Sequence, residues 1–438
     1  MDTERTSVPA VRPALAAACP ALASGSAADA VAGVVPSYVA APSSTDEVSA
    51  LLRAAASFGL SVVPRGAGTG LGWGMPPRTC DLLMDMGVMN QVLEHAAGDL
   101  VARVQAGATI GQLAAVLAAA GQQLALDAPA EATVGGVVAT GTAGPRRFRY
   151  GAPRDLLIGI TVVRADGVVA RAGGKVVKNV AGYDLGKLFA GSQGTLGLIT
   201  EATFRLHPLP AAMAWVTAEF GPAERAGAAA AVAAAAGSAL VPTAVELDWP
   251  GGSQRPLRVG VLLEGTGPGV AERAKQMSEL LSSAGGPVST GAVAVAETAP
   301  PRWGVLPDPA VVVRVSFWVS SLGPVLDALA AAGADAGVRP AVSGPAGAGA
   351  LYACLDPGTP EADAVRFVTA LRERAAGALG SSDGPRGPRG GVAVLAASPA
   401  VLAAAADGAV PGLALMRAVR DQFDPDHRMF PGRMEAGR

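Results

Sequence analysis

The chain has 438 residues, of which half are hydrophobic and 16% are charged, so it is long enough for two or three domains with large cores. Its 34 basic and 36 acidic residues give a net charge of −2, which argues against nucleic acid or an anionic membrane surface as a partner. The three cysteines, Cys19, Cys80 and Cys354, form no Cys-x-x-Cys pair, which argues against a zinc ribbon or an iron–sulfur cluster in this chain.

No segment of the sequence predicts export or a transmembrane span. Arg12, Pro13 and Pro20 interrupt the apolar N-terminal stretch, which is atypical of a signal peptide. The alanine-rich stretch 226–241 falls short of the ~20 apolar residues that a bilayer requires, and we expect an ordinary helix there. These features predict a cytoplasmic protein, with any membrane association made through partners.

Residues 64–74 are the most unusual stretch, because five glycines alternate with other residues directly after an apolar run. Such a backbone can adopt positive φ angles and turn several N–H groups toward one point, which suits a phosphate. No lysine follows the glycines as in a P-loop, and Pro76 and Pro77 oppose the helix that follows a Rossmann turn. The stretch predicts a phosphate-binding loop that does not open a helix, and by itself does not distinguish ATP, NAD and FAD.

The chain around this loop alternates strands and helices, which predicts an α+β fold. Expected strands are 34–39, 60–63, 81–86 and 101–107. Helices are expected after Ser44 or Thr45 up to Gly59 and from Thr109 to Gly121, since serine and threonine favour N-caps and glycine favours helix ends.

Two further regions of small residues follow. Residues 127–144 are expected to form a loop that a flat ligand could approach, followed by a solvated charged loop containing Arg146, Arg147, Arg149 and Arg154. Strands 156–164 and 168–170 are joined by an Asp-Gly hairpin turn. Residues 191–201 then run into a strand that ends at His207 and Pro208.

Residues 209–411 alternate strands with alanine-rich helices, which predicts an antiparallel sheet covered by helices. The expected strands are 258–264, 311–319 and 350–355, and the expected helices are 271–282, 322–332 and 362–376. A Gly-Pro-rich stretch at 381–391 is typical of a flexible loop.

Three motifs in this order resemble the flavoproteins of the vanillyl-alcohol oxidase and p-cresol methylhydroxylase type. They are Pro64-Arg65-Gly66-Ala67-Gly68-Thr69-Gly70, Ala132-Thr133-Val134-Gly135-Gly136, and Gly191-Ser192-Gln193-Gly194-Thr195-Leu196-Gly197-Leu198-Ile199-Thr200. Residues 144–147 and 174–184 are more closely similar to the FAD-binding subunit of bacterial glycolate oxidase. The tail at 423–433 resembles the ending of that family, with Phe430 where asparagine is usual.

The resemblance implies an FAD-binding domain of two subdomains and a cap domain with an antiparallel sheet. The implied boundaries are an N-terminal extension at 1–33, the FAD-binding domain at 34–210, the cap at 211–410 and a tail at 411–438 that returns to the FAD-binding domain. The residues implied to bind FAD are Pro64, Arg65, Gly66, Ala67, Gly68, Thr69, Gly70, Pro129, Thr133, Val134, Gly135, Gly136, Ala139, Thr140, Gly141, Gly194, Thr195, Gly197 and Ile199.

Some relatives attach FAD covalently through histidine or cysteine. His95 is expected in an exposed turn and Cys80 as a buried structural thiol, so the FAD is expected to be non-covalent. The cap has no histidine between His207 and His427, whereas relatives that oxidise D-2-hydroxy acids commonly carry a histidine-rich metal motif there. No metal site and no catalytic base are predicted.

Arg314 is the candidate substrate ligand. In strand 311–319 it shares one face with Ser316 and Trp318, where it could hold a carboxylate bidentately. The competing interpretation is a solvent-facing arginine whose aliphatic stem lies on Trp318.

The resemblance implies an FAD-dependent oxidoreductase that acts, as a glycolate-oxidase-like subunit, on a small 2-hydroxy acid. Its implied partners are a catalytic flavin subunit and an iron–sulfur subunit. Two alternatives remain, a stand-alone FAD-linked dehydrogenase of a hydroxy acid or alcohol and a non-catalytic FAD-binding assembly subunit.

Overall fold

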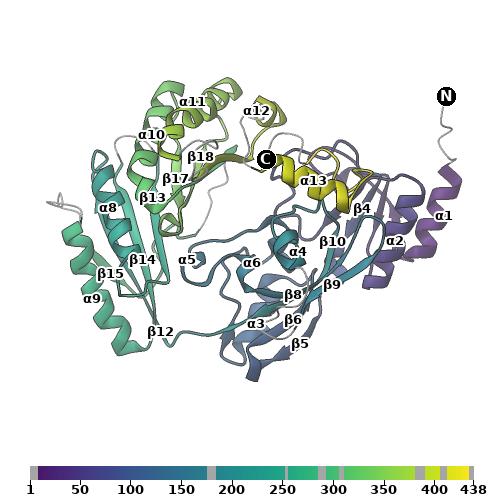
Figure 1. Ribbon diagram of the computed structural model, residues 1–438, viewed down its shortest axis with the longest axis horizontal. Coiled ribbons are helices and arrows are strands. Elements are labelled where there is room, and N and C mark those ends of the chain that lie inside the picture. The colour runs from purple at the N-terminus through teal and green to yellow at the C-terminus, as the bar shows by residue number, and fades with distance from the viewer. Residues whose placement is uncertain are drawn as a thin grey trace. The chain divides into compact units, whose positions relative to one another are not determined.

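The computed structural model describes residues 8–174, 184–251, 255–284, 293–304, 310–379, 390–404 and 412–433 (Figure 1). The predicted motif at 174–184 and the predicted loop at 381–391 therefore lie almost wholly outside the described residues. The chain divides into two compact units. Unit 1 comprises Met1–Ala143, Ala152–Leu209 and Gly412–Glu435, and unit 2 comprises Gly144–Gly151, Pro210–Pro411 and Ala436–Arg438.

Unit 1 contains two main sheets, the first of which carries the glycine-rich loop. Its strands run in the order β1 (Leu22–Ser24), β2 (Tyr38–Ala40), β4 (Leu82–Asp85) and β3 (Val62–Arg65). The strands β2, β4 and β3 are parallel, and the helices α1 (Val8–Ala18) and α2 (Thr45–Ser57) pack together beside this sheet.

The second sheet of unit 1 is antiparallel. Its order is β5 (Val92–Ala96), β6 (Val101–Gln105), β10 (Leu198–Arg205), β8 (Leu157–Val163) and β9 (Val169–Gly173). The helices α4 (Val134–Thr140), α6 (Pro153–Leu156) and α7 (Leu185–Phe189) lie against it, while α3 (Ile110–Ala118) packs on a small ladder formed by β7 (Gln122–Gln123) and β11 (His207–Pro208).

Unit 2 is built on one eight-stranded sheet whose pairings are all antiparallel. Its order is β15 (Ala294–Ala296), β12 (Ala212–Phe220), β14 (Leu257–Gly265), β13 (Ala244–Trp249), β17 (Ala341–Gly344), β18 (Ala350–Leu355), β16 (Val311–Ser316) and β19 (Gly391–Ala396).

Helices cover the apolar side of this sheet. They are α8 (Arg225–Ala236), α9 (Gly267–Ala284), α10 (Leu322–Ala336), α11 (Glu361–Leu379) and α12 (Pro399–Ala404), and Figure 1 shows α8 and α9 side by side along β12 and β14. The α+β class and the antiparallel cap sheet are confirmed. Within the described residues, no helix is both long and apolar enough to cross a bilayer.

The predictions for residues 127–144, for His95 and for residues 34–39 were wrong. Residues 127–144 contain the helix α4, which begins at Thr133 because its hydroxyl accepts a hydrogen bond from the Gly136 N–H. His95 lies in β5 rather than an exposed turn, and its Nε2 atom is 2.9 Å from Oε1 of Gln122. The predicted strand 34–39 is only the three-residue β2, since Val31 and Val34 instead form an isolated bridge.

Candidate FAD-binding site

The three predicted motifs meet in one groove of unit 1. About 730 Å³ of space lies within it, part of it open solvent. The predicted residues that line it are Pro64, Arg65, Gly66, Ala67, Gly68, Thr69, Gly70, Thr133, Gly135, Gly136, Ala139, Thr140, Gly194, Gly197 and Ile199.

Glycines let the three motifs approach each other closely. A Cβ atom on Gly66 would lie 2.0 Å from Oγ1 of Thr133, and one on Gly70 would lie 2.7 Å from Cγ2 of Thr140. The third motif meets the first in the same way, because a Cβ on Gly194 would lie 2.7 Å from Cγ of Pro64. Any larger residue at these positions would force the motifs apart.

The glycine-rich loop has an unused row of hydrogen-bond donors. Within the described part of the chain, the backbone N–H groups of residues 66–70 donate to no acceptor, and the next loop donor that is used is Leu71 N–H, which bonds to the Gly68 carbonyl. Gly68 has a φ of +82°, which favours glycine and lets consecutive N–H groups converge. Free N–H groups on the wall of a groove are the donors that a pyrophosphate accepts from.

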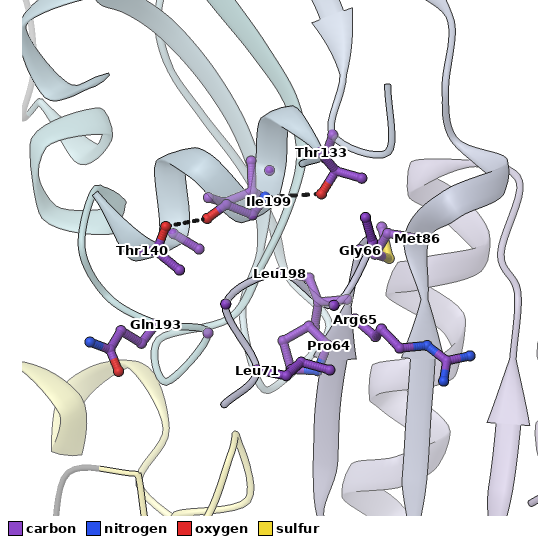
Figure 2. Close-up of a pocket in the computed structure, with 18 of the residues that line it drawn as sticks. Pro64, Arg65, Gly66, Leu71, Met86, Thr133, Thr140, Gln193, Leu198 and Ile199 are labelled. Atoms are coloured by element: carbon purple, nitrogen blue, oxygen red, sulfur yellow. Dashed lines mark hydrogen bonds between the residues drawn. The ribbon is translucent and has the colours of Figure 1, made fainter. Parts of the chain in front are cut away.

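The side chain of Arg65 does not belong to this cradle. Its Nη2 atom lies 2.8 Å from Oδ2 of Asp85 and 3.5 Å from Oδ1 of Asp29, and Figure 2 shows it extending away from Pro64 and Thr133. The hydrogen bond from Ser26, with a further contribution from the Arg65 charge, lowers the pKa of the Asp29 carboxyl. Two carboxylates therefore neutralise the Arg65 side chain.

Four of the residues predicted to bind FAD do not line the groove. Pro129 is exposed, and Val134 is fully buried in the first turn of α4. Gly141 ends α4 with a φ of +69°, and Thr195 is buried with its hydroxyl donating to the Ser192 carbonyl.

Seven residues that were not among those implied to bind FAD complete the lining. They are Leu71, Met86, Ala106, Gln193, Leu198, Phe430 and Arg433. Met86 and Ala106 follow the strands β4 and β6, so their places depend on sheet pairing that motif matching does not register. Phe430 and Arg433 come from the tail, more than 350 residues further along the chain than the loop they meet.

The cysteines of the chain are buried and free. Burial raises the pKa of the Cys80 thiol to about 12 and that of Cys354 to about 11, and it also raises the pKa of Cys19. They therefore remain protonated at neutral pH and are poor nucleophiles. The described residues contain no cluster of three or more His, Cys, Asp or Glu that would suit a metal ion.

Of the predicted charged loop, Arg147 and Arg149 lie in the helix α5 (Arg147–Tyr150) of unit 2 and Arg146 is its N-cap, whereas Arg154 lies in α6 of unit 1. The Tyr150 hydroxyl donates to Oε2 of the buried Glu264 at 2.8 Å, and the guanidinium of Arg149 lies over the Tyr150 ring. Burial, together with the bond to Glu264, raises the pKa of Tyr150 to about 12. The segment is therefore held by specific contacts rather than left as a solvated loop.

Arg314 lies on β16, as predicted, on the strand face opposite the buried Val313 and Val315. Its Nε atom is buried and donates to no acceptor within the described residues. The strand ends at Ser316 rather than at the predicted residue 319, so Trp318, which is 59% exposed, lies beyond it.

Comparison with known proteins agrees with this geometry. Residues 36–173 match the FAD binding domain family. The glycolate oxidase subunit GlcD of Bacillus subtilis is 34% identical over 178 residues, which are 40% of this chain and 38% of that protein. A D-lactate dehydrogenase of Archaeoglobus fulgidus is 39% identical over 171 residues, which are 39% of this chain and 38% of that protein. The chain thus spans about two fifths of the length of these relatives.

Solved structures extend the likeness to the whole fold. The 4-ethylphenol oxidase of Gulosibacter chungangensis matches with a TM-score of 0.73 and 17% identity over 100% of this chain and 98% of that one. A p-cresol methylhydroxylase matches with a TM-score of 0.72 and 16% identity over 98% of this chain and 96% of that one. The free N–H groups and the close glycine contacts fit a dinucleotide with a pyrophosphate. Residues 36–173 therefore match the FAD binding domain family, and the chain has the fold of the solved 4-ethylphenol oxidase and p-cresol methylhydroxylase.

Proposed function

We propose that this chain is an FAD-dependent oxidoreductase that takes part, as a glycolate-oxidase-like subunit, in the oxidation of a small 2-hydroxy acid. The observation that carries the proposal is the row of free N–H groups at residues 66–70, in a groove built by the part of the chain that matches an FAD binding domain. GlcD and the D-lactate dehydrogenase are named for small 2-hydroxy acids.

The chain's own residues would bind FAD non-covalently. The N–H groups of residues 66–70 would hold the pyrophosphate, while Thr133 and Thr140 keep the second motif against the loop. The bound flavin supplies the hydride acceptor and passes the electrons onward. The buried, protonated thiols are unsuited to covalent attachment.

Arg314 is the proposed ligand of the substrate carboxylate. Its buried Nε without an acceptor would gain a charge-assisted hydrogen bond from a bound carboxylate, and such a bond is worth about 1.5–3 kcal/mol. Substitution of Arg314 by alanine should weaken binding of a 2-hydroxy acid about 10- to 100-fold, with FAD still bound.

The test is to titrate the wild type and Arg314→Ala with glycolate and with D-lactate. Binding is monitored through the change in the flavin absorption spectrum. Arg366→Ala is the matched control, since Arg366 lies on α11 and pairs with Asp363. Equal affinities in Arg314→Ala and the wild type would remove Arg314 from the proposal.

Anaerobic mixing of the purified flavoprotein with glycolate, D-lactate and D-2-hydroxyglutarate tests the activity. We expect the flavin to be reduced when a catalytic flavin subunit and an iron–sulfur subunit of the same assembly are present. Reduction by the isolated chain would instead indicate a stand-alone dehydrogenase. Co-purification with such subunits but no reduction under any condition would indicate an assembly role.

A further inference from the structure

The C-terminal tail pairs with the edge strand β3 of the first sheet of unit 1 through one isolated bridge. The Val62 N–H donates to the Arg428 carbonyl and the Phe430 N–H donates to the Val62 carbonyl, both at 2.9 Å, so the tail runs parallel to β3. Because β3 leads directly into the glycine-rich loop, this pairing brings residues 430–433 to the loop.

Arg433 then binds the loop from the carbonyl side. Its Nη1 atom donates to the carbonyls of Leu71 and Met75 at 3.2 and 3.1 Å, and its Nη2 atom donates to those of Gly70 and Leu71, both at 3.2 Å. The residue is only 3% exposed and lines the groove. One planar guanidinium thus fixes three carbonyls at the end of the loop, in a geometry that a lysine cannot reproduce.

Phe430 holds Arg433 in place. The guanidinium lies 4.1 Å from the centre of the Phe430 ring, which is a favourable cation–π distance. Phe430 is 1% exposed and has a φ of +44°, a conformation that a bulky residue adopts only when its surroundings hold it. Such a buried outlier beside a groove is typical of a functional site.

We propose that Arg433 is a positioning residue for the glycine-rich loop. By holding the carbonyls of residues 70, 71 and 75, it keeps the N–H groups of residues 66–70 available to the groove, and its buried positive charge favours a pyrophosphate there. The second part of this inference rests on the proposed binding of FAD. Retention of the cofactor then depends on Arg433 in the tail.

Two variants of the full-length protein test this role. Arg433→Met removes both the charge and the donors, so we expect FAD to bind about 10- to 100-fold more weakly to the reconstituted protein. Arg433→Lys keeps the positive charge but lacks the planar guanidinium with its two donor nitrogens, so we expect a smaller loss of affinity for FAD. In the FAD-free protein, hydrogen exchange of the Leu71 and Trp73 amides, which donate to the Gly68 and Gly70 carbonyls, should be faster in both variants than in the wild type.

Arg428→Met is the matched control. Arg428 is also buried, comes from the same tail and donates to the carbonyls of Leu60 and Ala165, but does not line the groove. We expect it to lower the temperature of unfolding without changing the affinity of the folded protein for FAD more than about threefold, which corresponds to less than about 1 kcal/mol.

The possible outcomes separate this inference from the proposed function. If the wild type binds FAD and both Arg433 variants bind it equally well, or if loop exchange in them is unchanged, the positioning role is refuted. If Arg433→Met does not fold, Arg433→Lys decides between these results. If the wild type binds no FAD while loop exchange still rises in Arg433→Lys, the proposed function fails and the positioning role stands.

Discussion

Gly66 is the position at which one methyl group should disturb the groove most. A Cβ there would lie 2.0 Å from Oγ1, 3.0 Å from Cβ and 3.1 Å from Cγ2 of Thr133. Thr133 cannot move freely, because it is 4% exposed and its hydroxyl caps α4 by accepting from the Gly136 N–H. In Gly66→Ala, either the loop moves away from α4 or the cap is lost.

The magnitude follows from these contacts. Loss of a threonine N-cap destabilises a protein by about 1 kcal/mol, and overpacking adds about 1–3 kcal/mol. Displacement of the loop would remove one or two charge-assisted hydrogen bonds to the pyrophosphate, each worth about 1.5–3 kcal/mol. We therefore expect Gly66→Ala to lower the unfolding free energy by about 1–3 kcal/mol and to weaken FAD binding at least about tenfold.

The assay is titration of the FAD-free protein with FAD, monitored by flavin fluorescence. It is applied to the wild type, Gly66→Ala, Thr133→Ala and the double variant, which together form a double-mutant cycle. The second substitution removes Oγ1 and Cγ2, so Gly66→Ala should weaken FAD binding much less in that background. Gly72→Ala is the control in the same loop, because a Cβ at Gly72 meets no atom within 4 Å. Unchanged FAD affinity in Gly66→Ala, or equal losses in Gly66→Ala and Gly72→Ala, would refute the reasoning.

Three further predictions follow from the charged and buried groups. Arg65→Gln should leave the FAD affinity within about threefold of the wild type, a difference below 1 kcal/mol, because Asp85 already neutralises the Arg65 side chain; a tenfold loss in a reconstitution titration would contradict this. Cys80 should not react with an aromatic disulfide reagent at pH 8 until the protein is unfolded, since burial raises its pKa to about 12; rapid labelling of the folded protein would contradict that burial.

The third concerns Tyr150, whose pKa is raised from 10.0 to about 12 in the folded state. The unfolded chain loses this proton first, so stability is retained below pH 10 and lost as the pH rises toward 12. Tyr150→Phe should therefore show a shallower loss of stability in denaturant titrations over this range, and identical pH profiles would contradict the role of the bond to Glu264.

The glycine-rich motifs could be predicted from the sequence because they impose local demands. Gly66, Gly68 and Gly70 let other segments approach the backbone closely and permit positive φ angles wherever the loop lies in the fold. Their spacing can therefore be recognised in the sequence alone. The helix α4 was missed because Gly135 and Gly136 disfavour a helix, although Thr133 was an available N-cap signal. Here packing against Ala106 overrides propensity, since a Cβ on Gly135 would lie 2.7 Å from the Ala106 Cβ.

The contribution of the tail could not be predicted at the level of residues. The resemblance implied that the tail returns to the first domain, but Arg433 binds carbonyls of residues 70, 71 and 75, and carbonyls carry no sequence signature. The side-chain partners of Arg65, which the resemblance implied to bind FAD, could not be predicted either. Only the structure shows that Asp29 and Asp85 already bind its side chain.

The most direct test of the central claim is the flavin content of the purified chain. The structure predicts a yellow protein, or an FAD-free protein that takes up one equivalent of FAD, and the flavin should be released into the supernatant when the protein is denatured with acid. A colourless protein that takes up no FAD in a reconstitution titration would contradict the assignment of the groove, and flavin that stays with the denatured chain would contradict non-covalent binding.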